Sequence, residues 1–219
     1  QYAILERVVA GAGLVYCGDA RSDYLTDRRR INPTPPALVA GLPRIENQVP
    51  AEVMSAYQLR GGRAVWLKYG AWALTPNAPF TWRGLVDYDY RMLLVGRAAL
   101  WATGKDSPIQ IASVAGDGPL TISRTDAAPR AEVTLTSTAV QPAQPARVEL
   151  DLALRRPLDG ATLPLEPRTA TVTPGQQTIV AVPLPRLRAG EYYLDVIARA
   201  GGKVVACGAG NVVVESPYG

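Results

Sequence analysis

Residues 4–17 read ILERVVAGAGLVYC, and this stretch indicates one unit of an α/β sheet. Residues 4–9 have the spacing of a short amphipathic helix, the glycines at 11 and 13 end it, and residues 14–17 are an apolar strand. A helix joined by a glycine turn to a buried strand is typical of the interior of a parallel sheet. We therefore expect a partial, open α/β domain, which begins inside a fold and borrows strands from other polypeptide.

The overall composition is that of a folded protein with room for two ordinary domains. The 219 residues are 47% hydrophobic and 19% charged, which is far from the composition of a disordered chain. The formal net charge is only +4, and no Lys/Arg stripe with interleaved aromatic residues is present, so we expect no nucleic-acid partner. The longest apolar helical run, 92–102, contains Arg97 and is too short to cross a bilayer, so we expect no membrane span.

The hydrophobic periodicity changes near residues 104–108, which read GKDSP. Before this point, residues 53–59 and 64–69 are predicted to be two strands of a hairpin, joined by a turn that contains two glycines. Residues 85–103 are predicted to be a long helix. Its expected apolar face consists of Tyr88, Met92, Val95, Ala99 and Ala102.

After this point the chain is rich in Val, Thr, Leu and Pro, and apolar and polar residues alternate. Gly, Pro and Asp separate the apolar runs at roughly 8–12-residue spacing, which is the pattern of an antiparallel sandwich. We expect Tyr192 or Tyr193 to make the corner hydrogen bond of such a fold. The predicted domains are thus a partial α/β domain over residues 1–105 and an all-β immunoglobulin-like sandwich over residues 106–219. The expected strands are 108–115, 119–124, 130–138, 146–155, 168–173, 177–183, 190–199 and 203–215.

Three passages of the first domain resemble a known family. Residues 8–15, 59–70 and 98–102 are similar to the helix–glycine–strand passage, the late hairpin and the closing helix of type 1 glutamine amidotransferase-like domains. The passages at residues 74–76, 87–90 and 98–102 are similar to the closing helix of the versions found in large bacterial glycoside-hydrolase-like proteins. The resemblance covers about residues 1–105 and implies the C-terminal part of a flavodoxin-like domain. Residues 108–219 resemble immunoglobulin-like or fibronectin-type modules in general.

The resemblance implies an accessory role rather than an activity. Active members of that family use a Cys–His–Glu triad, whereas this chain has no histidine. Non-catalytic relatives serve as packing or oligomerisation modules in β-galactosidase-like enzymes. The resemblance also implies an extracellular or periplasmic location, with other domains or chains of the same parent protein as partners.

The cysteines are predicted to be structural. A cysteine nucleophile needs a base to form its thiolate, normally histidine, and none is present. Cys17 and Cys207 each lie in an apolar strand, so we expect two buried free thiols, with a disulfide between them as the alternative. Residues 28–30 are three consecutive arginines, which we interpret as a solvated or salt-bridged surface, with an anionic partner as the alternative.

Two groups of residues are weak candidates for a site. Asp19 and Asp23 follow the first strand at its carboxyl end, where α/β sites lie, and glycoside hydrolysis needs two opposed carboxylates. Beside the neighbouring arginines, these acids are more simply members of an ion-pair network. Trp72, Trp82 and Tyr88 belong to an aromatic stretch that suits either contact with sugar rings or packing against another domain.

The sequence leaves three functions open. The favoured one is a non-catalytic structural or accessory segment of a larger, secreted, carbohydrate-active protein. The second is an Asp/Glu-dependent glycoside hydrolase whose site other polypeptide completes. The third is a module that binds a polysaccharide or a cell surface. No cofactor and no metal is expected for any of them.

Overall fold

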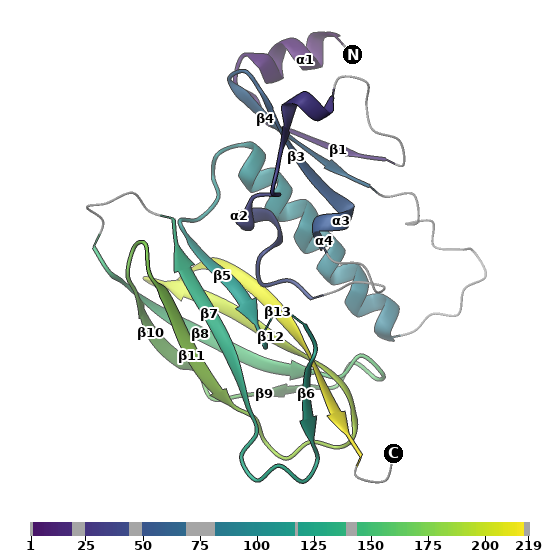
Figure 1. Cartoon of the computed structure of the whole chain (residues 1–219), viewed down its shortest axis with the longest axis vertical. Helices are drawn as coiled ribbons and strands as arrows, with labels where there is room; N and C mark the ends of the chain where they lie inside the picture. The colour runs from purple at the N-terminus through teal and green to yellow at the C-terminus, as the bar shows by residue number, and fades with distance from the viewer. Residues whose placement is uncertain are drawn as a thin grey trace, which may run out of the picture. The chain divides into compact units, whose positions relative to one another are not determined.

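The computed structural model describes residues 2–18, 25–43, 50–68, 82–116, 118–138 and 144–216, with the backbone alone for residues 82–87 (Figure 1). The chain divides into two compact units. The mixed unit consists of Gln1–Val39 and Arg44–Asp106, and the β unit consists of Ala40–Pro43 and Ser107–Gly219.

The mixed unit contains a four-stranded sheet in the order β1-β4-β3-β2. Strands β3 (Met54–Leu59) and β4 (Gly62–Leu67) form the predicted hairpin, which is confirmed. Strand β1 (Leu14–Cys17) pairs with β4 in parallel, and β2 (Arg30–Ile31) pairs with β3 antiparallel. Only the β1·β4 pair of this sheet is therefore parallel among the described strands.

The mixed unit also contains helices in its described part. They are α1 (Tyr2–Val9), the 3-10 helix η1 (Asp27–Arg29), α2 (Pro36–Val39), α3 (Pro50–Val53) and α4 (Trp82–Ala102). The long helix predicted over 85–103 is thus confirmed, and it begins three residues earlier. A buried cluster joins α1 to the hairpin and consists of Val8, Leu25, Tyr57, Leu59 and Ala64.

Helix α4 buries Ala102 as predicted, but otherwise a different face from the one that its sequence predicts. Tyr88 and Met92, which we expected inside, are 48% and 44% exposed. Strand β4 supplies the reason, because its Arg63 guanidinium lies 5.0 Å from the centre of the Trp101 ring and donates to the Trp101 carbonyl. The helix carries two apolar stripes, and periodicity alone does not choose between them. The buried positions are Tyr90, Leu94, Ala98, Trp101 and Ala102.

The β unit contains one six-stranded and one three-stranded sheet (Figure 1). The larger sheet has the order β10-β8-β12-β13-β6, with β9 also beside β8, and the smaller has the order β11-β7-β5. All described strand pairs of the β unit are antiparallel except β13·β6. The strands are β5 (Ile109–Val114), β6 (Leu120–Ser123), β7 (Arg130–Ser137), β8 (Ala146–Arg155), β9 (Thr162–Pro164), β10 (Arg168–Val172), β11 (Gln177–Pro183), β12 (Gly190–Ala200) and β13 (Lys203–Glu215).

The two sheets of the β unit enclose one hydrophobic cluster. Every second residue of β8 from Val148 to Leu154 is buried, and Val133 and Leu135 of β7 are buried as well. This alternation follows from the two-residue period of a strand. The predicted corner bond is made by Tyr192, whose hydroxyl donates to the Arg188 carbonyl at 3.0 Å.

A short piece from the first half of the chain belongs to the β unit. The Gly41 amide donates to the Ala112 carbonyl at 3.1 Å, and the Gly41 carbonyl accepts from the Ala209 amide at 2.7 Å. Residue 41 therefore bridges β5 and β13. A Cβ atom on Gly208 would lie 2.5 Å from the Gly41 carbonyl oxygen, so glycine at 208 is what lets the backbones approach.

The predicted fold class is wrong. The described chain is mostly β, with 48% strand and 19% helix in three sheets and four helices, rather than a partial α/β domain followed by a distinct sandwich. Two physical reasons account for the error. The helix–glycine–strand passage at residues 2–17 leads into an otherwise antiparallel sheet, and α2 and α3 are single turns instead of crossover helices. In addition, residues 40–43 are built into the β unit, so this unit is not confined to the second half of the sequence.

Candidate functional site

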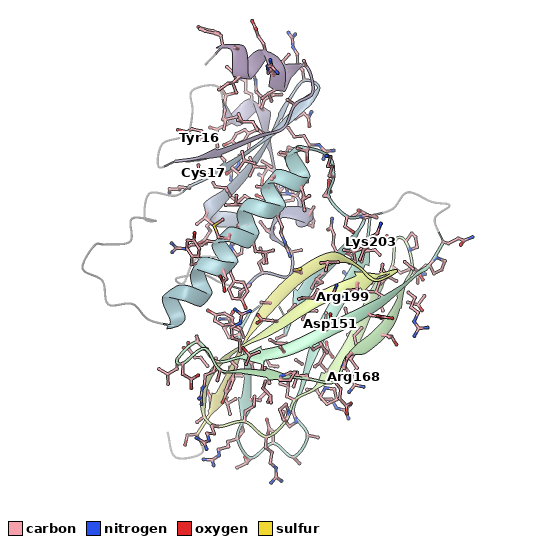
Figure 2. All side chains as sticks on the ribbon, turned by 180° about the vertical axis from the view of Figure 1, so that it is seen from behind. Tyr16, Cys17, Asp151, Arg168, Arg199 and Lys203 are labelled. Atoms are coloured by element: carbon pink, nitrogen blue, oxygen red, sulfur yellow. The ribbon has the colours of Figure 1, made fainter. Side chains whose placement is uncertain are left out.

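The outward face of β8 and β12 carries two ion pairs between the strands. Arg155 of β8 donates from Nε to Asp195 Oδ2 of β12 at 2.8 Å, and its Nη2 lies 2.7 Å from the same oxygen. Arg199 of β12 donates from Nε to Asp151 Oδ2 of β8 at 2.7 Å (Figure 2). The even-numbered residues of β8 from 148 to 154 are buried in the core, so the odd-numbered residues point outward. These carboxylates therefore serve to connect neighbouring strands.

We expect Arg155→Gln to lower the free energy of unfolding of the β unit by about 1–2 kcal/mol, since it removes a guanidinium group that donates to the half-buried Asp195 carboxylate. The matched control is Arg147→Gln on the same strand, where the arginine is exposed. Its effect should stay within about 0.5 kcal/mol. Urea unfolding followed by far-ultraviolet circular dichroism measures both. Equal shifts in the two variants would mean that the pair has no structural role.

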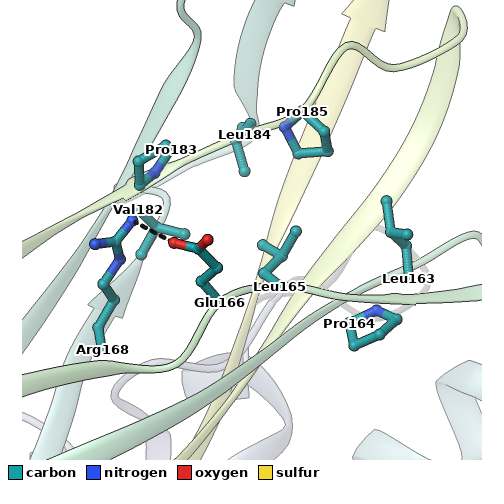
Figure 3. A pocket seen from close by; sticks show the side chains of 9 residues that line it. All are labelled: Leu163, Pro164, Leu165, Glu166, Arg168, Val182, Pro183, Leu184 and Pro185. Atoms are coloured by element: carbon teal, nitrogen blue, oxygen red, sulfur yellow. Dashed lines mark ion pairs between the residues drawn. The ribbon is translucent and has the colours of Figure 1, made fainter.

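A groove of about 350 Å³ opens in the β unit between the β9–β10 edge and the end of β11 (Figure 3). Its walls are apolar side chains and three prolines, and its charged residues are Glu166 and Arg168. The Thr178 hydroxyl of β11 donates to the Thr171 carbonyl of β10 at 3.1 Å, which links the edges of the two sheets beside it. Proline has no amide hydrogen, so these walls offer few donors to an added strand.

The two charged side chains of this groove, Glu166 and Arg168, do not form a close ion pair. Arg168 Nη2 lies 3.8 Å from Glu166 Oε2, which is longer than a hydrogen bond, and the Glu166 side chain is 88% exposed. Among the described residues, the buried Arg168 Nε finds no hydrogen-bond partner. A bound molecule would meet the charged ends of Glu166 and Arg168 with its polar groups and the walls with its apolar part. The groove is thus suited to binding and lacks a pair of opposed carboxylates.

Most of the predicted site residues lie outside the described part of the chain. This applies to Asp19, Asp23 and Trp72, and only the backbone of Trp82 is described. Tyr88 lies on the exposed side of α4. The predicted catalytic and sugar-binding roles of these residues stay predictions.

The exposure of Cys17 differs from the prediction. It was expected in a buried strand, yet it is exposed, because β1 is the edge strand of its sheet (Figure 2). Desolvation by the surrounding chain raises the pKa of the Cys17 thiol, so little thiolate is present at neutral pH. Cys207 is half-buried, and both cysteines are free thiols.

Among the described residues, no group of three or more His, Cys, Asp or Glu side chains could hold a metal ion. In the same part of the chain, we find no helix with both the length and the apolar character that a bilayer crossing requires.

Sequence reasoning missed the residues that carry the polar features of the β unit. Asp151 and Arg155 alternate with core leucines, which indicated that they face outward, but their partners are 48 and 40 residues away. Arg168 belongs to no motif. Strand β9, which forms one side of the groove, was absent from the expected strands, because it is only 3 residues long.

Comparison with known proteins gives weak similarities only. No protein-family model and no curated protein matches this chain. A CARDB domain from Pyrococcus furiosus, solved in complex with di-metal ions, matches 50% of this chain and 88% of its own, with 13% sequence identity and a TM-score of 0.36.

Two β-glucosidases match to a similar degree. The enzyme from Erythrobacter marinus has 13% identity and a TM-score of 0.33, over 43% of this chain and 14% of the enzyme. The enzyme from Listeria innocua, in complex with glucose, has 11% identity and a TM-score of 0.34, over 48% of this chain and 15% of the enzyme. The matched part thus covers a small share of either enzyme, and similarities at this level assign no function.

Proposed function

We propose that this chain is a non-catalytic accessory segment of a larger carbohydrate-active protein. The observation that carries the proposal is that two carboxylates of the β unit are paired with arginines. Asp151 and Asp195 each accept a short hydrogen bond from an arginine on the neighbouring strand. The single carboxylate of the groove, Glu166, likewise faces an arginine. A glycosidase needs two carboxyl groups roughly 5–9 Å apart across the sugar, one of them protonated. The guanidinium partners of Asp151 and Asp195 occupy carboxylate oxygens that such chemistry requires.

A binding role is the second candidate, and the groove at β9–β10 favours it. Its apolar walls and the guanidinium group of Arg168 together suit a molecule with an apolar body and an acceptor group. The two candidates are compatible, because accessory segments of carbohydrate-active proteins include binding modules. An extracellular or periplasmic location, and contact with other domains of a parent protein, are part of the same proposal.

A screen of aryl glycosides with the whole chain tests the accessory role. We expect no release of nitrophenol above the buffer rate, while a β-glucosidase run in parallel releases it. Turnover that disappears in folded Asp19→Asn and Asp23→Asn variants would replace the accessory role by the glycosidase alternative. Turnover that survives both substitutions but disappears in Glu166→Gln would move the catalytic site to the groove.

A further inference from the structure

A second recess of the β unit is lined by three arginines. It measures about 460 Å³, and its lining consists of Arg124, Thr125, Arg186, Leu187 and Arg188. All three arginines are exposed. Among the described residues, none of them forms an ion pair. Three like charges in one recess repel one another, so the recess favours an anion that neutralises them.

The turn after β6 holds the first arginine in place. The Ser123 amide donates to Asp126 Oδ2 at 2.9 Å, and the Asp126 amide donates to the Ser123 carbonyl at 3.0 Å. The Arg124 amide donates to the Glu215 carbonyl of β13 at 3.2 Å. The nearby carboxylate of Asp126 thus accepts a backbone hydrogen bond within the turn, and it forms no ion pair with Arg124.

The segment between β11 and β12 holds the other two arginines. At one end the Leu184 amide donates to the Pro129 carbonyl at 2.9 Å, and at the other the Tyr192 hydroxyl donates to the Arg188 carbonyl at 3.0 Å. Both ends of this segment are therefore tied to the β framework. A backbone that is held before the ligand arrives lowers the ordering cost of binding.

We propose that this recess binds an anionic polysaccharide through its sulfate or carboxylate groups. The planar guanidinium group offers paired donors that match both kinds of oxyanion. Leu187 provides an apolar wall for the C–H face of a sugar ring, and the described lining residues include no aromatic side chain on which a nucleic-acid base would stack. The inference names a ligand class for the accessory role proposed above and rests on that role.

The test is the affinity of the whole chain for a heparin-derived hexasaccharide and for an oligogalacturonate hexasaccharide, measured by isothermal titration calorimetry at low and high NaCl. We expect at least one of them to bind, and binding to weaken as salt rises. The triple variant Arg124→Gln, Arg186→Gln, Arg188→Gln should bind at least about tenfold more weakly. The matched control is Arg28→Gln, Arg29→Gln, Arg30→Gln, which removes three exposed arginines from the mixed unit and should change the affinity by less than about twofold.

Each outcome of this experiment bears on a different part of the proposal. Preference for the sulfated or the carboxylated probe identifies the anion and supports the proposal in either case. Absence of binding to both probes at low salt, or an equal loss in the control variant, overturns the site. Tighter binding of a single-stranded oligonucleotide of equal charge overturns the ligand class. Glycosidase turnover would overturn the accessory role, yet the arginine-dependent loss of binding would still establish the recess as an anion site.

Discussion

Leu194→Ala should lower the free energy of unfolding of the β unit by about 3–4 kcal/mol, the largest effect that we expect from a single substitution. Leu194 lies on β12, near the middle of the six-stranded sheet, and its side chain is fully buried. It stands directly opposite Leu154 of β8 on the same face, and both belong to the central hydrophobic cluster. Truncation removes apolar surface from the core and leaves a cavity that two paired neighbouring strands cannot easily collapse to fill.

The matched control for this prediction is Leu158→Ala. Leu158 is 82% exposed, so the same chemical deletion should change the unfolding free energy by less than about 0.5 kcal/mol. Urea unfolding followed by far-ultraviolet circular dichroism compares the two variants. Similar shifts for Leu194→Ala and Leu158→Ala would contradict the assignment of β12 to the centre of the core.

Gly62→Ala should destabilise the mixed unit by about 2–3 kcal/mol, although it adds only one methyl group. A Cβ atom at the start of β4 would overlap the Val8 carbonyl oxygen and lie 2.6 Å from the Ala12 carbonyl oxygen. Both obstacles are backbone atoms, which cannot rotate away as a flexible side chain can. Either β4 or the end of α1 must therefore shift, and the buried cluster that contains Val8 and Ala64 would lose contacts.

Gly96→Ala is also a glycine-to-alanine substitution, but we expect it to stabilise the mixed unit rather than destabilise it. Gly96 lies on the exposed side of α4, and a Cβ atom there would meet nothing within 4 Å. Alanine has the higher helix propensity, so we expect stabilisation by up to about 1 kcal/mol. All four tryptophans precede the β unit's main segment, so tryptophan fluorescence during urea unfolding reports on the mixed unit. Midpoints that move in the same direction for Gly62→Ala and Gly96→Ala would refute the steric argument.

The positions of most elements could be predicted because the signals are local. Alternation of apolar and polar residues located the strands that became β5–β8 and β10–β13, and the glycine turn located the hairpin β3–β4. The errors concern features that local patterns do not contain. The buried face of α4 depends on the contact of Arg63 with Trp101, and the exposure of Cys17 depends on β1 being an edge strand.

The candidate sites were predictable only in part. Sequence reasoning selected acids after the first strand, such as Asp19, and aromatic residues before the long helix, such as Trp72; both lie outside the described residues. The polar features of the β unit bring together segments that are far apart in the chain, as in the recess that joins Arg124 to Arg186. No spacing rule connects such residues, because a loop of any length can close between them at little additional cost in entropy.

The sequence by itself determined where the long helix and most of the strands lie, that the chain has no histidine base, and that the second half alternates as a two-sided β structure. Only the tertiary structure decided that Gly41 bridges two strands of the β unit and that Arg155 meets Asp195. It also decided that three arginines share one recess. The physical reason is that the hydrophobic periodicity is a property of each single segment. Strand register and side-chain proximity arise only when distant segments pack against one another.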